Sequence, residues 1–580
     1  MTDIVPGMPR ARVQAKLPDG RIFEAPPGTP IGDVLQIACG MPEVPLTAAI
    51  VNGRLRELTT PLIADAEVTP LDAGTTDGAR VYRRSLVFLM CAAISEVFPD
   101  VEVYIEHSAT TAGGYFCEVR GGAAFTQANL ARIEQRMLEI VAEDAPIVRT
   151  TVPVAEAIDM FRTRGEIDTA RLLAHRDRQT VELYSLKGRR DYSQGYLVRS
   201  TGGLRYFALH AMPPGFLLQF PHQHAPTEIS PPAPYPKLFS VFEQAGHWLD
   251  RLGIRNAGAL NDAIVADRIQ EISLVSEALH EAELAHIADE ITSSSRRIRV
   301  VLIAGPSSSG KTTFSKRLAV QLLASGLKPM PLGLDDYFVD RSKTPRDANG
   351  EYDYETIRAL DLELFNQNLR SLIEGRPTEL PHYNFMTGNR EPGPTVTLDR
   401  DHLIIVEGIH GLNPDLVTEI PSECVFRIYV SALTQLNLDR HNRVSTTDCR
   451  LIRRIVRDAA TRGYNATDTL RRWPSVTRGA KQHIFCFQEN ADAIFNSSLV
   501  YELAVLRPFA EPLLLQVRPD SSDFLEANRL LSFLQWFRPA RLAVVPENSI
   551  LREFVGGSVL ADFHLWPIPS DPGAGKHGRR

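Results

Sequence analysis

The sequence predicts a multidomain protein that combines α+β and α/β domains. The chain has 580 residues, and at about 100 to 200 residues per domain more than one hydrophobic core is expected. Hydrophobic residues make up 44% and charged residues 23% of the chain, a composition typical of folded proteins. A near-continuous apolar segment at 298–304 begins an alternation of strand-like and helix-like segments that continues to about Leu506. That alternation is typical of an α/β domain with a mainly parallel sheet.

Charge and cysteine content limit the classes of function. The 63 basic and 70 acidic residues give a formal net charge of −7, so nucleic acid or an anionic membrane would need a local basic patch. The apolar stretch at 86–94 is shorter than a membrane span, and the first residues lack the apolar core of a signal peptide. The six cysteines form no C-x-x-C pair, which disfavours disulfides and a cysteine-based zinc site. We therefore expect a cytoplasmic protein with reduced thiols and no membrane partner.

The first element, at 1–75, has the pattern of a small sheet wrapped around one helix. Apolar residues alternate from Val13 to Leu17, and a Pro-Asp-Gly turn leads to a second strand at Ile22. Apolar side chains then recur at helical spacing between 31 and 38, and an Asn-Gly turn precedes a closing strand near Val68. The pattern predicts a β-grasp module. It contains no catalytic constellation, so we interpret it as a docking or regulatory module.

The second element, at 76–220, is predicted as an α+β domain. A buried-type helix lies around 86–94, and strands are expected at 101–105 and 115–119. The helix predicted at 127–142 carries its apolar residues on one face.

The remaining elements are a connector, the α/β domain and a C-terminal extension. A Pro-rich run from Pro213 to Pro236 predicts an extended connector, and helical spacing returns from Ala263 to Ile291. The extension is expected to hold two helices and a strand-like segment at 542–545. We place the linker with its helices at 221–295 and the α/β domain at 296–506. The extension follows at 507–566 and a flexible tail at 567–580.

A glycine-rich loop between the buried strand and a helix carries the strongest chemical signal. Residues 305–312 are GPSSSGKT, which fits the P-loop pattern G-x-x-x-x-G-K-[ST]. Glycines let backbone N–H groups close around phosphate oxygens, and the following helix N-terminus favours an anion. Lys311 is expected to reach the β- and γ-phosphates, and the Thr312 hydroxyl to take one Mg²⁺ position. The predicted nucleotide-binding residues are Gly305, Ser307, Ser308, Ser309, Gly310, Lys311, Thr312 and Thr313.

Acidic residues follow two other predicted strands of this domain. Asp335 and Asp336 come directly after a strand, at an edge where one of them could accept the proton of an attacking hydroxyl. Spacing alone also allows a capping pair. Glu407 ends the strand that starts at His402, a position suited to Mg²⁺ or its water shell, or to an ordinary strand-end acid.

A row of arginines lies further along the chain. Arg450, Arg453 or Arg454, and Arg457 fall at helical spacing, so one helix face presents guanidinium groups. A charge run is usually a solvated face, whereas phosphoryl transfer needs cations on the charge that develops at the phosphate. Downstream of a P-loop we favour the second interpretation.

In this order the motifs resemble the uridine kinase and phosphoribulokinase family of P-loop kinases, over about 298–497. The similar segments are GPSSSGKTT, LDDYF, EYDYETIRALDLELFNQNLRSLIEG, PHYNFMTGNR, LIIVEGI and DCRLIRRIVRD. The resemblance implies a P-loop kinase that uses ATP and Mg²⁺, with Asp335 as the base. It also implies that DCRLIRRIVRD is a lid helix whose arginines, chiefly Arg454 and Arg457, close over the phosphates.

The same resemblance implies residues for the acceptor. It implies that Asp353 binds the acceptor's sugar and that Tyr383 and Arg390 lie near the ribose, in the adjoining loop. The family's contacts to a pyrimidine correspond, by alignment, to Gly388, Tyr464 and Arg472. A site without those polar contacts discriminates poorly between bases, so we expect a broad or shifted base preference.

The front of the chain resembles the amino-terminal half of threonyl-tRNA synthetases, where a β-grasp (TGS) module precedes an editing domain. The similar segments are LPDGRIFEAPPGTPIGDVLQIA, VNGRLRELTTPL and IEQRMLEIVAEDAPIVR. The editing residues of that family correspond here to Arg84, Phe88, Ser193 and Leu197, which implies an editing-like α+β domain without its deacylation site. The fused arrangement, with its terminal VVPENSILREFVGG, resembles a bacterial group of nucleoside or uridine kinases.

These observations predict an ATP-dependent kinase that phosphorylates the 5′-hydroxyl of a nucleoside. Two alternatives stay open: a kinase for another sugar-like metabolite, and an RNA- or ribosome-associated regulatory ATPase whose front modules contact RNA. The sequence leaves open the acceptor's identity and a homo-oligomeric state. We interpret His222 and His224 as linker histidines, because no third metal ligand is near them in the sequence.

Overall fold

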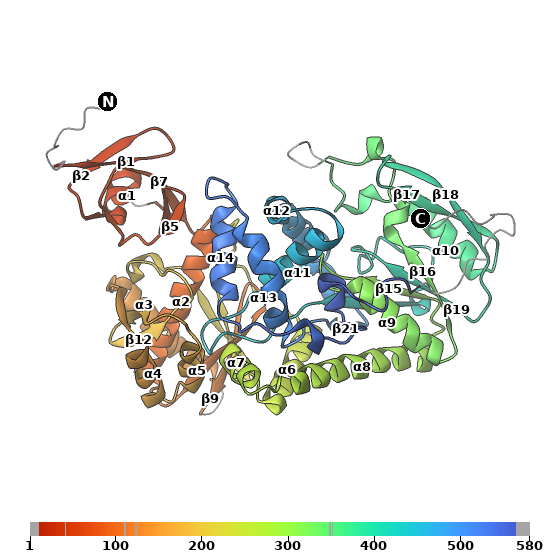
Figure 1. Ribbon diagram of the computed structural model, residues 1–580, viewed down its shortest axis with the longest axis horizontal. Coiled ribbons are helices and arrows are strands. Elements are labelled where there is room, and N and C mark those ends of the chain that lie inside the picture. Colours follow the sequence, from red (N-terminus) through yellow and green to blue (C-terminus); the bar gives the residue numbers. More distant parts are fainter. Residues whose placement is uncertain are drawn as a thin grey trace.

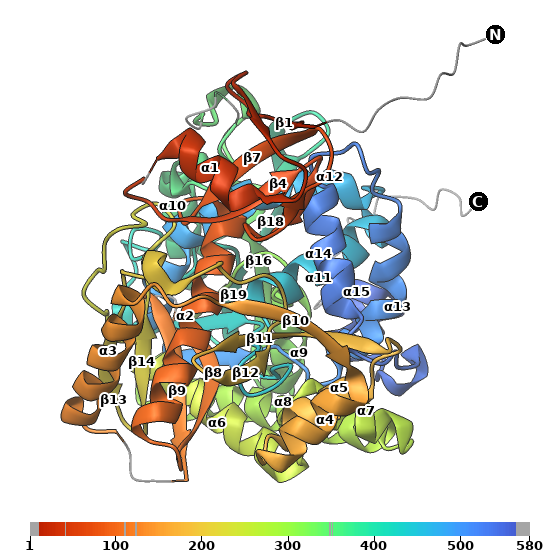
Figure 2. The ribbon, with the colours of Figure 1, turned by 90° about the vertical axis from the view of Figure 1, so that its left-hand side faces the viewer.

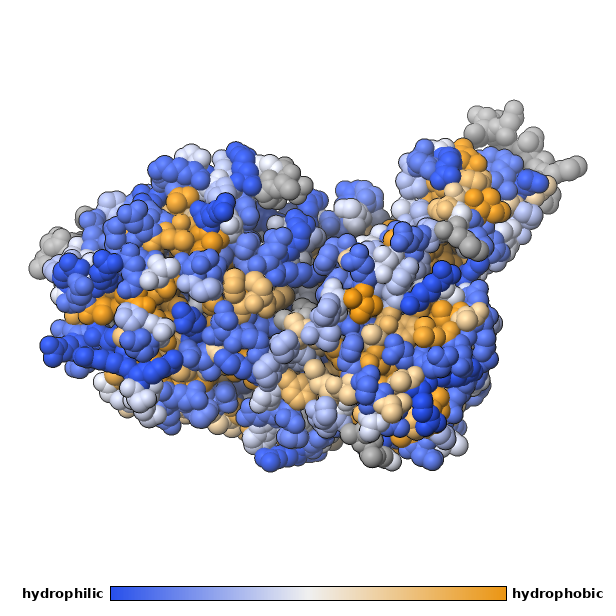
Figure 3. All heavy atoms as spheres, turned by 180° about the vertical axis from the view of Figure 1, so that it is seen from behind, coloured by the Kyte–Doolittle hydropathy of each residue, from blue (hydrophilic) through white to orange (hydrophobic). Residues whose placement is uncertain are grey.

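The predicted fold class is confirmed by the computed structural model, which describes residues 11–40, 42–109, 112–121, 125–346, 350 and 352–563. The β-grasp module lies at one end of the molecule and the α/β domain at the other, and the long helix α8 (Ile269–Ser293) runs along the lower edge of the view toward the α/β domain (Figure 1). None of the helices in these ranges is both long and apolar enough to cross a membrane. On the face turned away in Figure 1, hydrophilic residues predominate and apolar residues form separate patches (Figure 3).

The N-terminal module is a five-stranded sheet with one helix, as the alternation predicts. The strand order is β2-β1-β7-β4-β5. The apolar residues of the expected strands and helix are buried, including Val13, Leu17 and Val68. The elements are β1 (Val13–Lys16), β2 (Ile22–Ala25), β3 (Thr29–Pro30), α1 (Ile31–Cys39), β4 (Leu46–Val51), β5 (Arg54–Arg56), β6 (Pro61–Leu62) and β7 (Ala66–Asp72).

The second domain packs two helices against a four-stranded antiparallel sheet of order β13-β14-β9-β8. A second sheet, β10-β11-β12, carries α4 and α5 beside it (Figure 2). The elements are α2 (Thr76–Val97), β8 (Glu102–Ala109), β9 (Gly114–Arg120), α3 (Gln127–Ala142), β10 (Val148–Pro153), α4 (Val154–Thr163), α5 (Ile167–Ala174), β11 (Thr180–Leu186), β12 (Arg189–Tyr192), β13 (Ala208–Met212) and β14 (Gly215–Gln219).

Two predictions for the connector are wrong in part. The Pro-rich run predicts a connector that begins at Pro213, but the buried residues of β14 (Gly215–Gln219) form an inner strand of the four-stranded sheet. The helical segment from Ala263 is divided, because Asp267 takes a positive φ of 58° between two helices. The helices are α6 (Pro236–Leu252), α7 (Ala257–Val265) and α8 (Ile269–Ser293).

The α/β domain is built on a five-stranded sheet of order β16-β19-β15-β20-β21, in which all neighbouring pairs are parallel. The central strand, β15, is fully buried, as its apolar run predicts. A β17·β18 hairpin stands outside this sheet. The elements are β15 (Val300–Ala304), α9 (Lys311–Ala324), β16 (Lys328–Gly333), α10 (Leu362–Ile373), β17 (Thr378–Asn384), β18 (Asn389–Val396), β19 (His402–Glu407), β20 (Val425–Ser431), α11 (Thr446–Thr461), α12 (Ala466–His483) and β21 (Ala493–Asn496).

The C-terminal extension adds α13 (Glu502–Leu515), which begins within the predicted α/β domain, then α14 (Phe524–Leu534) and α15 (Arg552–Val555). The expected strand at 542–545 is wrong: residues 542–544 form a 3-10 turn. Their apolar side chains pack toward α8, where the Ser273 hydroxyl donates to the Val544 carbonyl at 2.6 Å. The predicted flexible tail, 567–580, lies outside the described residues.

The second domain and the α/β domain share one hydrophobic cluster in addition to their separate cores. A single cluster of buried residues extends from Val152 in β10 to Phe554 in α15. The loop before α11 also enters the second domain, where Arg440 pairs with Asp168 at 2.7 Å and His441 with Asp191 at 3.0 Å. The α/β domain is therefore in direct contact with the second domain.

Candidate active site

The P-loop lies between β15 and α9, as predicted, and its glycines are needed sterically. A Cβ at Gly305 would lie 2.0 Å from the Val430 carbonyl oxygen. Gly310 takes a φ of 87° at the N-terminus of α9, a conformation that favours glycine. The first backbone N–H groups of α9 have no partner within their own helix, which makes the loop a place for an anion.

Lys311, Thr312 and Glu407 lie together at the ends of β15 and β19. The Thr312 hydroxyl donates to Glu407 Oε1 at 2.7 Å, and Lys311 Nζ lies 3.4 Å from the Pro306 carbonyl oxygen. Desolvation lowers the pKa of Lys311, which the charge of Glu407 partly offsets. Desolvation likewise raises the pKa of Glu407, against the nearby Lys311.

The donor set at Thr312 and Glu407 fits Mg²⁺. Mg²⁺ prefers oxygen ligands and is usually held by one or two carboxylates together with substrate phosphates. Within the described ranges, the side chains of His, Cys, Asp and Glu form no group of three that could hold a metal ion. A phosphate-bound Mg²⁺ next to Thr312 needs no such group.

The structure separates the two adjacent acids after β16. Asp336 Oδ1 accepts from the Tyr383 backbone N–H at 3.2 Å and lies 3.2 Å from His382 Nδ1, so it fastens β17. The Asp335 residue keeps an exposed surface, but its carboxyl group lies among many protein atoms and its charge interacts with that of Lys311. Desolvation by the surrounding protein raises the pKa of Asp335, while the Lys311 ammonium lowers it and Asp336 raises it further. Asp335 is therefore the acid that faces the P-loop lysine.

The arginine row on α11 has two parts. Arg450 and Arg453 are buried, 1% and 0% exposed, and donate to the carbonyl oxygens of Ser307 and Ser308 beneath the P-loop. Arg453 is also paired with Glu502. These two guanidinium groups support the loop from behind, so the interpretation of the whole row as phosphate-facing is wrong.

The other two arginines, Arg454 and Arg457, do not lie beneath the P-loop. Arg454 Nη1 donates to Ser307 Oγ at 2.9 Å, and Arg457 lies beside Glu553 of the C-terminal extension at 3.5 Å. The structure thus brings both residues predicted to act on phosphates to the P-loop.

The three residues expected to bind the acceptor, Asp353, Tyr383 and Arg390, each have a partner within the protein. The Tyr383 hydroxyl donates to the Gly388 carbonyl at 3.3 Å within the β17·β18 hairpin. Arg390 pairs with Asp361, the N-cap residue of α10, at 2.7 Å and so joins the hairpin to that helix. Asp353 accepts from the Glu355 backbone N–H at 3.0 Å. Arg472 stacks over the Tyr464 ring at 4.4 Å.

Two acidic residues at the site were missed from the sequence. Desolvation raises the pKa of Glu355, with Arg454 and Lys311 opposing the shift and Asp353 reinforcing it. Its position two residues after Asp353 was the available signal. Glu553 approaches from a segment 240 residues beyond Thr313, a contact that no local pattern indicates.

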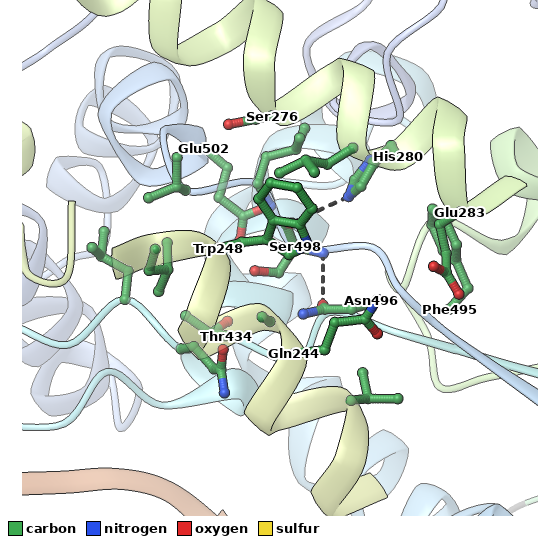
Figure 4. Close-up of a pocket in the computed structure, with 18 of the residues that line it drawn as sticks. Gln244, Trp248, Ser276, His280, Glu283, Thr434, Phe495, Asn496, Ser498 and Glu502 are labelled. Carbon is green, nitrogen blue, oxygen red and sulfur yellow. Dashed lines mark hydrogen bonds between the residues drawn. The ribbon is translucent and has the colours of Figure 1, made fainter. Parts of the chain in front are cut away.

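A cavity of about 320 Å³ lies behind the P-loop, between α6, α8 and the end of β21. Trp248, His280 and Asn496 lie around it in Figure 4. Burial lowers the pKa of His280 to about 3, so this ring is neutral. The charged lining residues among those described are Glu283 and Glu502, with neither lysine nor arginine. The cavity is therefore unsuited to a nucleotide's phosphates.

The four residues that correspond by alignment to the editing residues of threonyl-tRNA synthetases lie in the second domain. Arg84 Nε donates to the Tyr196 carbonyl at 3.2 Å, and Phe88 and Leu197 are buried in the core. Burial lowers the pKa of Arg84 to about 10. Two apolar side chains, one guanidinium and the half-buried Ser193 thus occupy these four positions. His222 and His224 stack with ring centroids 5.3 Å apart.

The parallel sheet with a P-loop after its central strand defines a nucleotide-binding α/β domain of the P-loop class. Residues 300–503 match the model of the Phosphoribulokinase / Uridine kinase family, which confirms the resemblance of the six motifs. The match supports a phosphotransferase.

The N-terminal region is similar to threonine–tRNA ligases, as predicted. The ligase of Aquifex aeolicus is 28% identical over 206 residues, 35% of this chain and 31% of that protein. The ligase of an Acidovorax species is 32% identical over 199 residues, 34% of this chain and 31% of that protein. The chain therefore spans about a third of the length of these curated relatives.

Solved structures of kinases are also similar. A structure described as a possible uridine kinase from Bacillus stearothermophilus is 25% identical, with 26% of this chain and 79% of that chain covered and a TM-score of 0.22. A D-glycerate 3-kinase from Cryptococcus neoformans is 13% identical, with 45% and 88% covered and a TM-score of 0.20.

Proposed function

We propose that the protein is an ATP-dependent kinase that transfers the γ-phosphate of ATP to the 5′-hydroxyl of a nucleoside. One observation carries the proposal: Asp335, Glu407 and the P-loop with Lys311 follow three neighbouring parallel strands, β16, β19 and β15. Their carboxyl ends line one edge of the sheet, where ligands bind in open α/β sheets. Phosphoryl transfer to a hydroxyl requires two groups: a cation at the phosphates and a base for the hydroxyl proton. Lys311 and Asp335 supply this pair.

Each residue has a distinct task in this proposal. The P-loop N–H groups and Lys311 hold the phosphates of ATP, and Arg454 and Arg457 add positive charge as the phosphoryl group leaves. Thr312 and Glu407 would hold Mg²⁺, which neutralises charge on the β- and γ-phosphates when bound.

Asp335 acts as the base. The acceptor oxygen attacks the γ-phosphorus, the bond to the β-phosphate oxygen breaks, and the hydroxyl proton passes to Asp335. The carboxylate must be ionised to accept that proton. Its pKa is raised above 3.8 by desolvation, which brings it nearer the pH of turnover and makes it a better base.

The acceptor's sugar is assigned to Asp353, with Glu355 as a second carboxylate beside it. Two neighbouring carboxylates accept hydrogen bonds from vicinal hydroxyls, which suits a ribose or another sugar-like metabolite. Tyr383 and Arg390 shape this side indirectly, through the hairpin they hold. Gly388 offers no side chain to a base, and Tyr464 stacks with Arg472, so base preference is expected to be broad.

A second candidate function is favoured by the similarity to threonine–tRNA ligases. The protein would then be an RNA- or ribosome-associated regulatory ATPase, with RNA bound by the N-terminal domains. This function predicts ATP hydrolysis that depends on RNA and no phosphorylated small molecule.

A phosphorylation screen tests the proposal. The full chain is incubated with Mg·ATP and a panel of nucleosides and sugar metabolites, and the products are identified by mass. Phosphorylated nucleosides, formed at the 5′ position and lost in Lys311→Ala, are the expected result. Phosphorylated sugars instead would move the acceptor class, and RNA-dependent hydrolysis alone would replace the proposal with the second function.

A further inference from the structure

The end of the C-terminal extension packs directly on the P-loop side of the α/β domain. Lys316 Nζ donates to the Leu560 carbonyl at 2.6 Å and to the Ala561 carbonyl at 3.2 Å. Phe554 is buried, with the Arg453 guanidinium 5.0 Å from its ring centroid. We refer to residues 549–561 as the C-terminal clamp. The clamp thus contacts both α9, which follows the P-loop, and α11, which carries the arginines.

The clamp places a carboxylate on the N-terminus of α9. Glu553 Oε2 accepts from the Thr313 hydroxyl at 2.9 Å and from the Thr313 backbone N–H at 3.3 Å. Its other oxygen, Oε1, lies 3.5 Å from Arg457 Nη1. The side chain is 15% exposed.

The partners of Glu553 are phosphate-binding groups. Thr313 is the third residue of α9, so its N–H is one of the donors that a P-loop helix offers to the α- and β-phosphates. Arg457 is a cation aimed at the same place. A carboxylate is the anion that a protein chain itself can supply to such a site.

A phosphate and this carboxylate exclude each other. One N–H and one hydroxyl cannot serve both anions, and like charges at contact distance repel strongly. Glu553 also acts on the electrostatics of the neighbouring groups, since its charge raises the pKa values of Lys311 and Glu407.

We propose that Glu553 of the C-terminal clamp occupies a phosphate position of the P-loop and that a nucleotide must displace it to bind. This inference rests on the proposed function only in that the P-loop takes a nucleotide. Only molecules in which the clamp is released can then bind nucleotide. The apparent affinity equals the intrinsic affinity multiplied by the fraction of released molecules. A partner or ligand that removes the clamp would raise that affinity by the same factor.

Equilibrium binding of Mg·AMP-PNP to the full chain, followed by titration calorimetry, tests the proposal without turnover. Glu553→Gln keeps the shape of the side chain and removes its charge. Glu547→Gln is the matched control, because Glu547 is an exposed carboxylate six residues earlier in the extension. We expect Glu553→Gln to bind the nucleotide about 5- to 150-fold more tightly, the range of ordinary coupling free energies. The control should bind as the wild type does.

Hydrogen exchange of the wild-type chain gives a second measurement that needs no variant. The backbone amides of 549–561 should exchange faster when Mg·AMP-PNP is bound. Equal or weaker binding by Glu553→Gln, or slower exchange of the clamp with nucleotide, would overturn the inference and make Glu553 a structural cap or a nucleotide ligand. Absence of nucleotide binding in wild type and variant alike would instead refute the proposed function.

Discussion

Replacing Asp335 and Asp336 one at a time shows which of these two adjacent acids after β16 is the catalytic base. Asp335 faces Lys311 and has a raised pKa, whereas Asp336 is bonded to the first residues of the β17·β18 hairpin. In Asp335→Asn the proton acceptor is lost, so kcat should fall roughly 10² to 10⁴-fold, about 2.7 to 5.5 kcal/mol of barrier. ATP affinity should stay nearly unchanged, since no phosphate contact is removed.

The expected effect at Asp336 is much smaller. An Asn at 336 can still accept from the Tyr383 N–H. The pair with His382 is 38% and 62% exposed at its two side chains, so losing it costs at most about 1 kcal/mol, roughly a fivefold effect on rate. Steady-state kinetics of both variants with the best acceptor, together with calorimetric ATP binding, measure the difference.

The pH dependence of kcat/KM gives a second test of Asp335 as the base. A base works only when ionised, so kcat/KM should decline as the pH falls through the raised pKa of Asp335, above the ordinary value of 3.8. Asp335→Asn should lack that acidic limb. Full kcat in Asp335→Asn with a large loss in Asp336→Asn would refute the assignment of the base.

Three further predictions follow from other parts of the chain. The full chain should not hydrolyse Ser-tRNA, because buried Phe88 and Leu197 and the Arg84 guanidinium occupy the place of the editing residues; measurable release of serine would contradict this. Asp353→Ala should raise KM for the acceptor more than Gly388→Ala does, and kcat/KM should differ by less than about 10³-fold between pyrimidine and purine nucleosides, whereas strict pyrimidine preference would mean that other residues read the base. Arg453→Met should destabilise the fold by about 3 to 5 kcal/mol in urea titrations, because it leaves buried Glu502 unpaired, and the double variant with Glu502→Leu should recover most of the loss; an unchanged midpoint in the single variant would show that the pair is not structural.

The sequence predicted what depends on local pattern. The P-loop could be recognised because its spacing and its place between a buried strand and a helix are both local. The acids Asp335 and Glu407 could be placed because the carboxyl ends of parallel strands share one edge. The β-grasp and the antiparallel strands followed from period-two alternation.

Other features depend on contacts between distant segments. Helical spacing puts Arg450 and Arg453 in one row with Arg457, but only the packing of α11 on the P-loop shows that the first two are buried. Proline content favoured a connector at 213–221, yet the buried face of β14 pairs with β9. Glu553 carries no motif of its own and becomes part of the site only through the fold.

We propose above that Asp335, Lys311 and the P-loop transfer phosphate from ATP to an alcohol. The most direct test is mass analysis of the products formed from Mg·ATP and a nucleoside panel by wild-type chain, Lys311→Ala and Asp335→Asn. The account predicts a nucleoside 5′-monophosphate with the wild type, none with Lys311→Ala, and a rate roughly 10² to 10⁴-fold lower with Asp335→Asn. ATP hydrolysis without a phosphorylated acceptor from any member of the panel would contradict it.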